Sequence, residues 1–300
     1  MKLLTVRHLT VYRYAQPVTF GEHRLMFRPR DSHDMRLLDT GLTISPPAQV
    51  RWLHDVFGNS IAVASFTGAA AELSFENEMK LEHYGVSKNE FALDPTAETY
   101  PFVYSPLELP DLMPWIERRY PDPEGRLDEW VKTFYAGEPV DTTELLTGMT
   151  HGIRQQLSYQ ARDLFGTRSP AETLAAASGT CRDYALLMIE AARTLGLGAR
   201  FVSGYLYDAV ADANGAGLVG GAATHAWVEV YLPGAGWTEF DPTNGMVGGE
   251  NLIRVAVARD PLQAVPVQGT FEGPTDAFLG MTVDVQVTQA DPAAPPAVRG

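Results

Sequence analysis

The first 90 residues alternate between apolar and polar positions. In one long segment the apolar side chains share a face: Leu73, Phe75, Met79 and Leu81. The residues between them are mostly charged, which is typical of a strand with one buried and one solvated face. Shorter runs of β-branched and aromatic residues are separated by Pro, Gly, Asp and Asn, and residues 55–59 have the composition of a hairpin connection. We therefore predict a small β-sandwich domain over residues 1–90.

Residues 91–125 follow no such alternation, because prolines crowd this segment. Of the 21 prolines in the chain, the segment holds these: Pro95, Pro101, Pro106, Pro110, Pro114, Pro121 and Pro123. Proline lacks a backbone N–H donor, which excludes long helices and central strands here. We predict an extended connector between two domains. A second segment rich in proline and alanine, residues 290–300, predicts a disordered tail.

From residue 126 onward the apolar spacing becomes that of helices. Two sets of apolar residues recur every three or four positions: Leu127, Trp130, Val131, Phe134 and Tyr135, and then Leu146, Met149, Ile153 and Leu157. Each set falls on one face of an amphipathic helix. Ser169 and Glu172 form a capping box with proline at the first helical position, which predicts the start of a third helix.

The helix expected next is apolar on nearly all faces. Residues 185–195 are interrupted only by Glu190, Arg193 and Thr194, and Gly196 follows them. A helix that is apolar all round is buried in a core, and glycine is a frequent helix stop. We predict a buried helix that ends at Gly196.

The period returns to two after this helix. Three strands are expected, at residues 200–206, 226–232 and 236–241. Pro233 and Gly234 form a tight turn between the last two strands, which are therefore expected to be antiparallel.

Two further segments complete the second domain. Residues 208–224 are rich in Gly and Ala, which predicts a mobile surface loop placed to act as a lid. Val283, Val285 and Val287 alternate with polar residues and predict a final strand. We expect residues 126–289 to form one α+β domain in which a buried helix packs on an antiparallel sheet.

Composition narrows the possible functions. The chain has 300 residues, 45% of them hydrophobic, which is enough for two domain cores, and its formal net charge of -14 argues against nucleic acids and acidic membranes as partners. A single cysteine excludes an intrachain disulfide, and the seven scattered histidines lack metal-binding spacing, so we predict no metal and no other cofactor. No apolar run approaches the ~20 residues of a membrane helix, and charge interrupts the N-terminal segment, which predicts a cytoplasmic protein.

Three residues could together perform nucleophilic chemistry. Cys181 lies in the first turn of the buried helix, where free backbone N–H groups and the helix dipole favour a thiolate. His225 begins one strand and Asp241 ends the next, so the turn between the strands brings them to the same end of the sheet. A cysteine nucleophile needs a base, and the base needs a group that fixes its tautomer. Taken singly, these residues have structural alternatives: a small core hydrophobe, a strand histidine and a turn-starting aspartate.

Three sequence blocks around these residues carry a resemblance. They are Gly-Thr-Cys-Arg-Asp-Tyr-Ala at 179–185, Thr-His-Ala-Trp-Val-Glu-Val at 224–230 and Gly-Trp-Thr-Glu-Phe-Asp-Pro-Thr-Asn at 236–244. Together they resemble the signature of bacterial transglutaminase-like proteins, which are often described as candidate cysteine proteases. Residues 23–30 and 52–59 resemble the β-domain that precedes the catalytic core in that family. The resemblance implies a papain-like domain with a Cys-His-Asp triad at Cys181, His225 and Asp241.

The resemblance also implies an activity, namely thiol-dependent acyl transfer from the amide bond of a peptide or protein substrate. If water resolves the thioester, the protein is a peptidase or amidase; if an amine does, it is a transglutaminase. We favour hydrolysis, because neither Trp227 nor Trp237 is placed to require an apolar tunnel for an amine. A third possibility is a binding or scaffolding protein without catalytic activity.

Other positions near the three blocks have less certain roles. Thr180 and Arg182 flank the cysteine where the family commonly has Val and Gln, which leaves substrate preference open. Asp183 and Trp227 are expected to be structural. The backbone N–H of Cys181 is one expected oxyanion donor, and an upstream side chain, Tyr159 or Gln160, is the candidate for the second.

Overall fold

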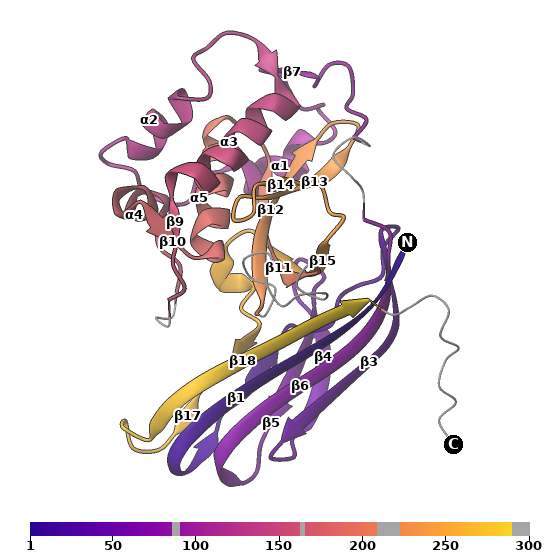
Figure 1. The fold of residues 1–300 in the computed structure, drawn as a ribbon, viewed down its shortest axis with the longest axis vertical. Helices are drawn as coiled ribbons and strands as arrows, with labels where there is room; N and C mark the ends of the chain where they lie inside the picture. Colours follow the sequence, from indigo (N-terminus) through magenta and orange to yellow (C-terminus); the bar gives the residue numbers. More distant parts are fainter. Residues whose placement is uncertain (86–90, 163–165, 209–222, 290–300) are drawn as a thin grey trace.

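The chain was examined as a computed structural model, and the structure describes residues 1–85, 91–162, 166–208 and 223–289. Figure 1 shows an elongated, twisted β-sandwich beside a second body of helices and a central sheet. The predicted tail and most of the predicted loop at 208–224 lie outside the described residues. No helix in the described ranges is long and apolar enough to cross a membrane.

Two sheets form the sandwich. The larger contains β1 (Lys2–Phe20), β3 (Met35–Ser45), β6 (Ala69–His83), β17 (Phe271–Glu272) and β18 (Phe278–Gln289). The smaller contains β2 (His23–Leu25), β4 (Gln49–His54), β5 (Ser60–Ser65) and β16 (Val267–Gln268). The predicted alternation on β6 is confirmed, since all four of its apolar positions are buried. The predicted hairpin is also present and pairs β4 with β5, with His54 opposite Ser60.

The sandwich is not confined to residues 1–90. Strands β16, β17 and β18 come from the far end of the chain and pair with β2 and β1. The division we expected, with 126–289 wholly in the second domain, therefore differs from the sheets of the structure. Alternation identified the valine-rich strand correctly, but the pattern within one strand does not specify which distant strand it pairs with.

The proline-rich segment is ordered against the second domain rather than being a free connector. It contains β7 (Thr99–Tyr100) and the short helix α1 (Leu109–Ile116). The Tyr104 hydroxyl donates to the Tyr231 carbonyl at 2.9 Å and accepts from the Gly198 N–H at 2.9 Å. The indole of Trp115 packs edge-on against Trp237. Side-chain contacts of this kind, which composition does not reveal, hold the segment in place.

The second domain consists of helices packed around a five-stranded sheet. The helices are α2 (Arg126–Lys132), α3 (Thr142–Gln156), α4 (Pro170–Ala176), α5 (Cys181–Thr194) and the 3-10 helix η2 (Pro261–Gln263). The sheet order is β14 (Met246–Val247), β13 (Gly236–Asp241), β12 (His225–Leu232), β11 (Ala199–Leu206) and β15 (Leu252–Ala258). Short ladders pair β7 with β8 (Val140–Asp141) and β9 (Ser158–Tyr159) with β10 (Ser178–Gly179). The capping box at Ser169 and the antiparallel pairing of β12 with β13 are confirmed.

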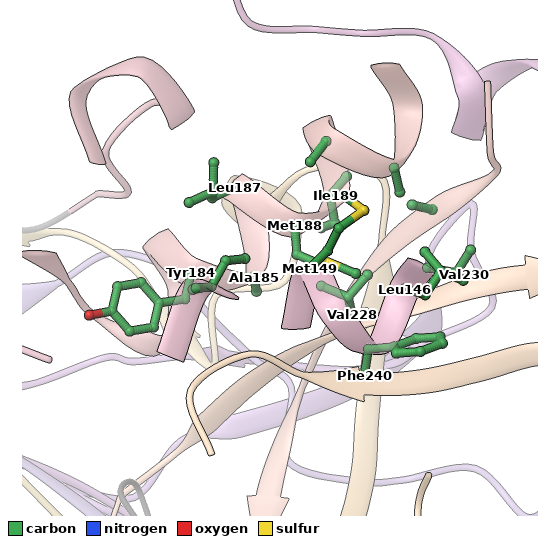
Figure 2. Close-up of a cluster of buried hydrophobic side chains, with 14 of the residues drawn as sticks. Leu146, Met149, Tyr184, Ala185, Leu187, Met188, Ile189, Val228, Val230 and Phe240 are labelled. Carbon is green, nitrogen blue, oxygen red and sulfur yellow. The ribbon is translucent and has the colours of Figure 1, made fainter. Parts of the chain in front are cut away.

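Helix α5 lies in the middle of this domain's core. Figure 2 shows its apolar side chains packed against α3 and against β12 and β13. Leu187, Met188 and Ile189 are fully buried, as are Met149 of α3 and Phe240 of β13. Burying a large aliphatic side chain stabilises a fold by about 1.5–3 kcal/mol, so this core fixes the helix that carries Cys181.

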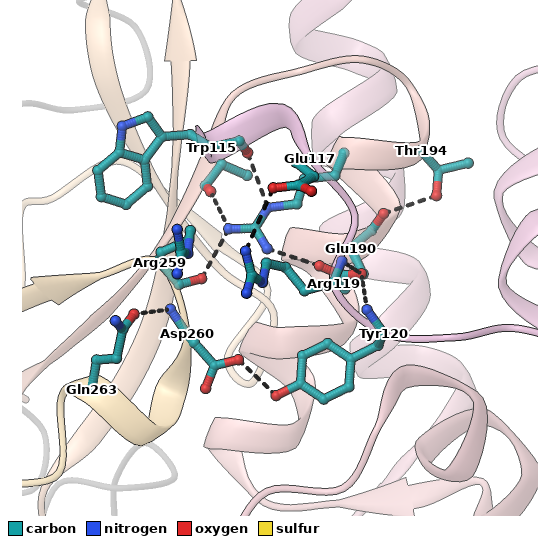
Figure 3. A network of polar contacts seen from close by, with 11 residues as sticks. Trp115, Glu117, Arg119, Tyr120, Glu190, Thr194, Arg259, Asp260 and Gln263 are labelled. Atoms are coloured by element: carbon teal, nitrogen blue, oxygen red, sulfur yellow. Dashed lines mark hydrogen bonds and ion pairs between the residues drawn. The ribbon is translucent and has the colours of Figure 1, made fainter. Parts of the chain in front are cut away.

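Glu190 and Arg193, two of the four charged residues of α5, are buried and paired with each other. Arg193 Nη1 donates to Glu190 Oε1 at 2.8 Å, and both side chains are fully buried. Glu190 also accepts the backbone N–H groups of Arg119 and Tyr120, which belong to the proline-rich segment (Figure 3). A buried charge is tolerated only with such partners. These hydrogen bonds therefore hold the proline-rich segment against α5 at Glu190.

Candidate active site

The start of α5 is built by a reciprocal cap. The Thr180 hydroxyl accepts from the Asp183 N–H, and the Asp183 carboxylate accepts from the Thr180 N–H at 2.9 Å. Gly179 precedes the cap because a Cβ there would lie 2.9 Å from Asp183 Cβ. Cys181 therefore occupies the first position of the helix, as the sequence predicts, with 9% of its surface exposed.

Asp183 also anchors the chain in front of this helix. Its fully buried carboxylate receives both Nη atoms of Arg162, at 2.9 and 3.1 Å, and the N–H of Arg168 at 2.7 Å. The structural role expected for Asp183 is consistent with these bonds. The sequence analysis missed Arg162, because the Arg–Asp pair spans 21 residues and no local pattern marks it.

His225 and Asp241 meet at one end of the second-domain sheet. His225 Nε2 lies 2.8 Å from Asp241 Oδ2, and both side chains are fully buried. The same carboxylate accepts from the Asn244 side-chain amide at 2.8 Å and from the Thr243 N–H at 2.9 Å. Asn244 was not singled out as a functional residue, although it closes the third sequence block. The imidazole stacks near Trp227, which is buried in the core as expected.

Charge coupling sets the protonation of this pair. Burial alone would lower the pKa of His225, but the Asp241 charge and hydrogen bond, followed by the Cys181 side chain, raise that pKa to about 10. Burial would raise the pKa of Asp241, yet the His225 charge and the bonds from Asn244 and Thr243 lower it. The pair is therefore an imidazolium facing a carboxylate at neutral pH.

Nδ1 of His225 is the ring nitrogen left for Cys181. It is buried and makes no hydrogen bond of normal geometry to any residue in the described ranges. Cys181 is nevertheless near enough to contribute to the raised pKa of the imidazole. An imidazolium beside a sulfur at a helix N-terminus is an arrangement that stabilises a thiolate.

A large cleft gives access to these residues. Its volume is about 1060 Å³, and its walls come from both domains. Cys181 and His225 line one wall, while Tyr12 of β1 and Met281 of β18 line the sandwich wall. Among the lining residues that the structure describes there is no Asp or Glu, although the chain has 37 acidic residues.

The two candidates for the second oxyanion donor differ in placement. Tyr159 lines the cleft and packs edge-on against Tyr184. Burial, and then the neighbouring Cys181, raise the pKa of Tyr159 to about 12, so its hydroxyl keeps the proton that it would donate. The Gln160 side chain is exposed and does not line the cleft. The geometry favours Tyr159.

Two more histidines, which the sequence analysis did not select as site residues, line the cleft. His8 on β1 has both ring nitrogens bonded, Nδ1 to the Tyr205 hydroxyl and Nε2 to Thr10 Oγ1, each at 2.8 Å. Burial lowers the pKa of His8 to about 4, so it is neutral. His23 Nδ1 is bonded to the Gly21 carbonyl. Both ring nitrogens of His8 are therefore engaged, as is Nδ1 of His23.

The described ranges contain no group of three His, Cys, Asp or Glu side chains arranged to bind a metal ion. The expectation of no metal and no other cofactor stays a prediction.

Comparison with known proteins identifies the family. Residues 4–82 match the bacterial transglutaminase-like N-terminal region, and residues 129–242 match the transglutaminase-like superfamily. The chain is a transglutaminase-like protein. The two matched segments of this transglutaminase-like protein fall on the sandwich and on the domain that carries Cys181, His225 and Asp241.

Similar proteins support the same architecture. A crystal structure of a proposed cysteine protease from Cytophaga hutchinsonii matches with a TM-score of 0.72 at 18% identity, covering 98% of this chain and 93% of that one. An uncharacterised protein of Mycobacterium tuberculosis is 26% identical over 296 residues, 95% of this chain and 93% of the relative. The protein-glutamine γ-glutamyltransferase of Pseudomonas aeruginosa is 41% identical over 66 residues, 22% of this chain and 10% of that enzyme. The α+β fold with an N-terminal β-sandwich is thus confirmed.

Proposed function

We propose that this transglutaminase-like protein is a thiol-dependent enzyme that cleaves amide bonds, as a cysteine peptidase or amidase. The observation that carries the proposal is the buried His225–Asp241 pair beside Cys181, at a helix N-terminus that opens into the cleft. A binding protein that had kept only the fold would have no need of a buried ion pair next to its single cysteine, since such pairs are costly to desolvate.

The chemistry follows from the atoms at the site. The Cys181 thiolate attacks the amide carbonyl carbon, and the displaced electron pair moves to the oxygen. The Cys181 N–H and the Tyr159 hydroxyl are the donors proposed to stabilise that oxyanion. The His225 proton, on Nδ1 because Nε2 is bonded to Asp241, passes to the leaving nitrogen as the C–N bond breaks. A thioester and a free amine result.

Water then completes the cycle. It attacks the thioester carbonyl while His225 takes up its proton, the C–S bond breaks, and the carboxylic acid leaves with Cys181 regenerated. Asp241 holds the imidazole throughout and stabilises its cationic form.

The similarity to a γ-glutamyltransferase favours an alternative in which an amine replaces water. A primary amine or a lysine side chain is cationic near neutral pH, and a carboxylate would be the natural group to attract it. The cleft residues that the structure describes include Arg162 and Arg182 but no carboxylate. Hydrolysis is therefore our first choice, whereas the peptide or protein nature of the substrate and a cytoplasmic location stay predictions.

The thiol itself provides the test. We expect Cys181 to react with iodoacetamide at neutral pH at least about tenfold faster than the cysteine of glutathione. His225→Gln should remove this advantage, whereas His151→Gln, at an exposed histidine of α3, should keep it. If the wild-type protein is alkylated slowly, at the same rate as both variants, Cys181 is a core residue and not a nucleophile. Mass spectrometry of peptide products with and without a labelled amine then separates hydrolysis from amine transfer.

A further inference from the structure

One face of the ribbon formed by β1 and β18 is divided into three zones. Strand β18 pairs with β1 in antiparallel register, with His8 opposite Val285, Thr10 opposite Val283 and Tyr12 opposite Met281. Directly paired residues share a face of a sheet, so these six side chains form one strip. In Figure 1, β18 lies along β1 on the side of the sandwich near the second domain.

On β1, both ends of the strip are covered. At the end nearest the second-domain sheet, Leu4 and Val6 pack against Tyr205 and Ile253. At the far end, Tyr14 joins the sandwich core. The side chains of these three β1 residues are removed from water, as expected for an interior sheet face.

The middle of the strip is open to the cleft. Tyr12, Met281 and Val283 line the cleft, and Met281 has 51% of its surface exposed. Phe278, at the start of β18, is 46% exposed and lines the same space. Leu262 of η2, which also lines the cleft, is 55% exposed. Exposed apolar side chains that line the same cleft as a nucleophile mark a surface that a ligand covers.

The two arginines that line the cleft already have partners within the protein. Arg162 is paired with the buried Asp183. Arg182 donates to the carbonyls of Pro261 and Ala264, and its guanidinium lies over the Phe201 ring at 4.8 Å. With these cations engaged and the described lining free of carboxylates, apolar contact dominates recognition.

We propose that Tyr12, Met281 and Val283 form a side-chain pocket that selects peptides with a bulky apolar or aromatic residue beside the scissile amide. The peptide lies between the start of α5 and the β1–β18 ribbon, so the sandwich is the specificity element of the enzyme. The volume of about 1060 Å³ matches the upper end of clefts that bind ligands of several hundred daltons, which suits a short peptide segment. This inference rests on the proposed thiol chemistry at Cys181.

Two alkylating probes test the pocket before any natural substrate is identified. Iodoacetanilide carries a phenyl ring on the amide nitrogen, and iodoacetamide does not. For wild-type protein, the ratio of the two alkylation rates should exceed the same ratio for glutathione by about tenfold, because the ring is bound beside the thiol. Met281→Glu should reduce the ratio toward that of glutathione. Thr282→Glu, whose side chain lies on the opposite face of β18, is the matched control and should keep the wild-type ratio.

A peptide library extends the same comparison. Wild-type enzyme should prefer Phe, Leu or Met next to the cleaved bond, and Met281→Glu should raise KM for these peptides while gaining relative turnover on Lys or Arg peptides. A fold defect would not produce that gain. Equal probe ratios in wild type and Met281→Glu, or a wild-type preference for charged residues, would overturn the pocket. Slow reaction of Cys181 with both probes would instead refute the thiol chemistry itself, so the two failures are distinct.

Discussion

Asp241 is held by more donors than a histidine alone would supply. Asn244 and Thr243 bind the same carboxylate as His225, so its position is fixed before any substrate arrives. The geometry explains why a residue followed by proline, which resembles an ordinary turn starter, is fully buried here. Preorganised charge of this kind is usually the largest contribution to catalysis.

Replacing that charge should abolish most of the activity. Asp241→Asn keeps the shape of the side chain but removes the anion that stabilises the imidazolium and selects its tautomer. We expect kcat to fall by about 10⁴-fold, with little change in KM, on a peptide that the wild-type enzyme cleaves. Asp284→Asn, at an exposed position of β18, should behave like wild type. Near-normal turnover by Asp241→Asn would assign the orienting role to another residue.

The protonation of His225 also predicts how stability varies with pH. Its pKa in the folded protein is raised to about 10 from 6.5, so its contribution is complete below pH 6.5 and is lost as the pH rises toward 10. Urea unfolding should therefore show a free energy of unfolding that declines from pH 7 to pH 10. His225→Gln should show a shallower decline over that interval, and a decline equal to that of wild type would contradict the coupling to Asp241.

At the scale of elements, the site residues lie on one helix and two strands that the sequence predicted. The opposite side of the cleft, formed by β1 and β18, was not predicted. The start and end of α5, and the antiparallel pair β12–β13, follow from local signals: capping, a glycine stop and a tight turn. The pairing of β18 with β1 joins residues more than two hundred positions apart and leaves no local trace. The same holds for Arg162 with Asp183, and for helix α1 within the proline-rich segment.

Strand β15 links three carboxylates through Arg254. Its Nη1 lies 2.9 Å from Glu229 and 3.2 Å from Glu239, and Nη2 lies 3.2 Å from Asp34 of the sandwich segment. Arg200 also pairs with Glu229, so two arginines face three acids and negative charge stays in excess. Burial first, and then the charge of Glu229, raise the pKa of Glu239 to about 8. The attraction of Arg254 lowers this pKa but is too weak to cancel the two effects.

Glu239 should therefore weaken the protein at alkaline pH. Because its folded pKa is raised, its stabilising contribution is present below its ordinary pKa of 4.5 and is lost as the pH rises through about 8. Glu239→Gln, which mimics the protonated acid, should be more stable than wild type at pH 9 and close to wild type at pH 5. Chemical denaturation at the two pH values measures this difference. A variant that is less stable at both would show that the carboxylate is needed in its charged form.

At the scale of the whole molecule, the first long strand and the last described strand pair in one sheet. Val285 of β18 is buried with Val6 of β1 in the cluster where the sandwich packs against the second domain. A chain ending at residue 277 would leave the edge of β1 opposite β6 without the β18 partner. We expect it to be insoluble or to melt about 10 °C below the intact protein, because it loses the buried Val285, the partly buried Val283 and Val287 of the same cluster, and the backbone pairing along β1. A chain ending at residue 289, which retains β18, should melt as the full chain does.

The pairing of β1 with β18 also orders events during synthesis on the ribosome. At roughly 5–20 residues per second, β18 emerges tens of seconds after β1, by which time α5 and the central sheet have been made. A nascent chain would thus carry its cysteine helix before the wall opposite that helix exists. If the wall selects substrates, a ribosome-bound or prematurely released chain has a reactive thiol without discrimination, and only completed translation yields a selective enzyme.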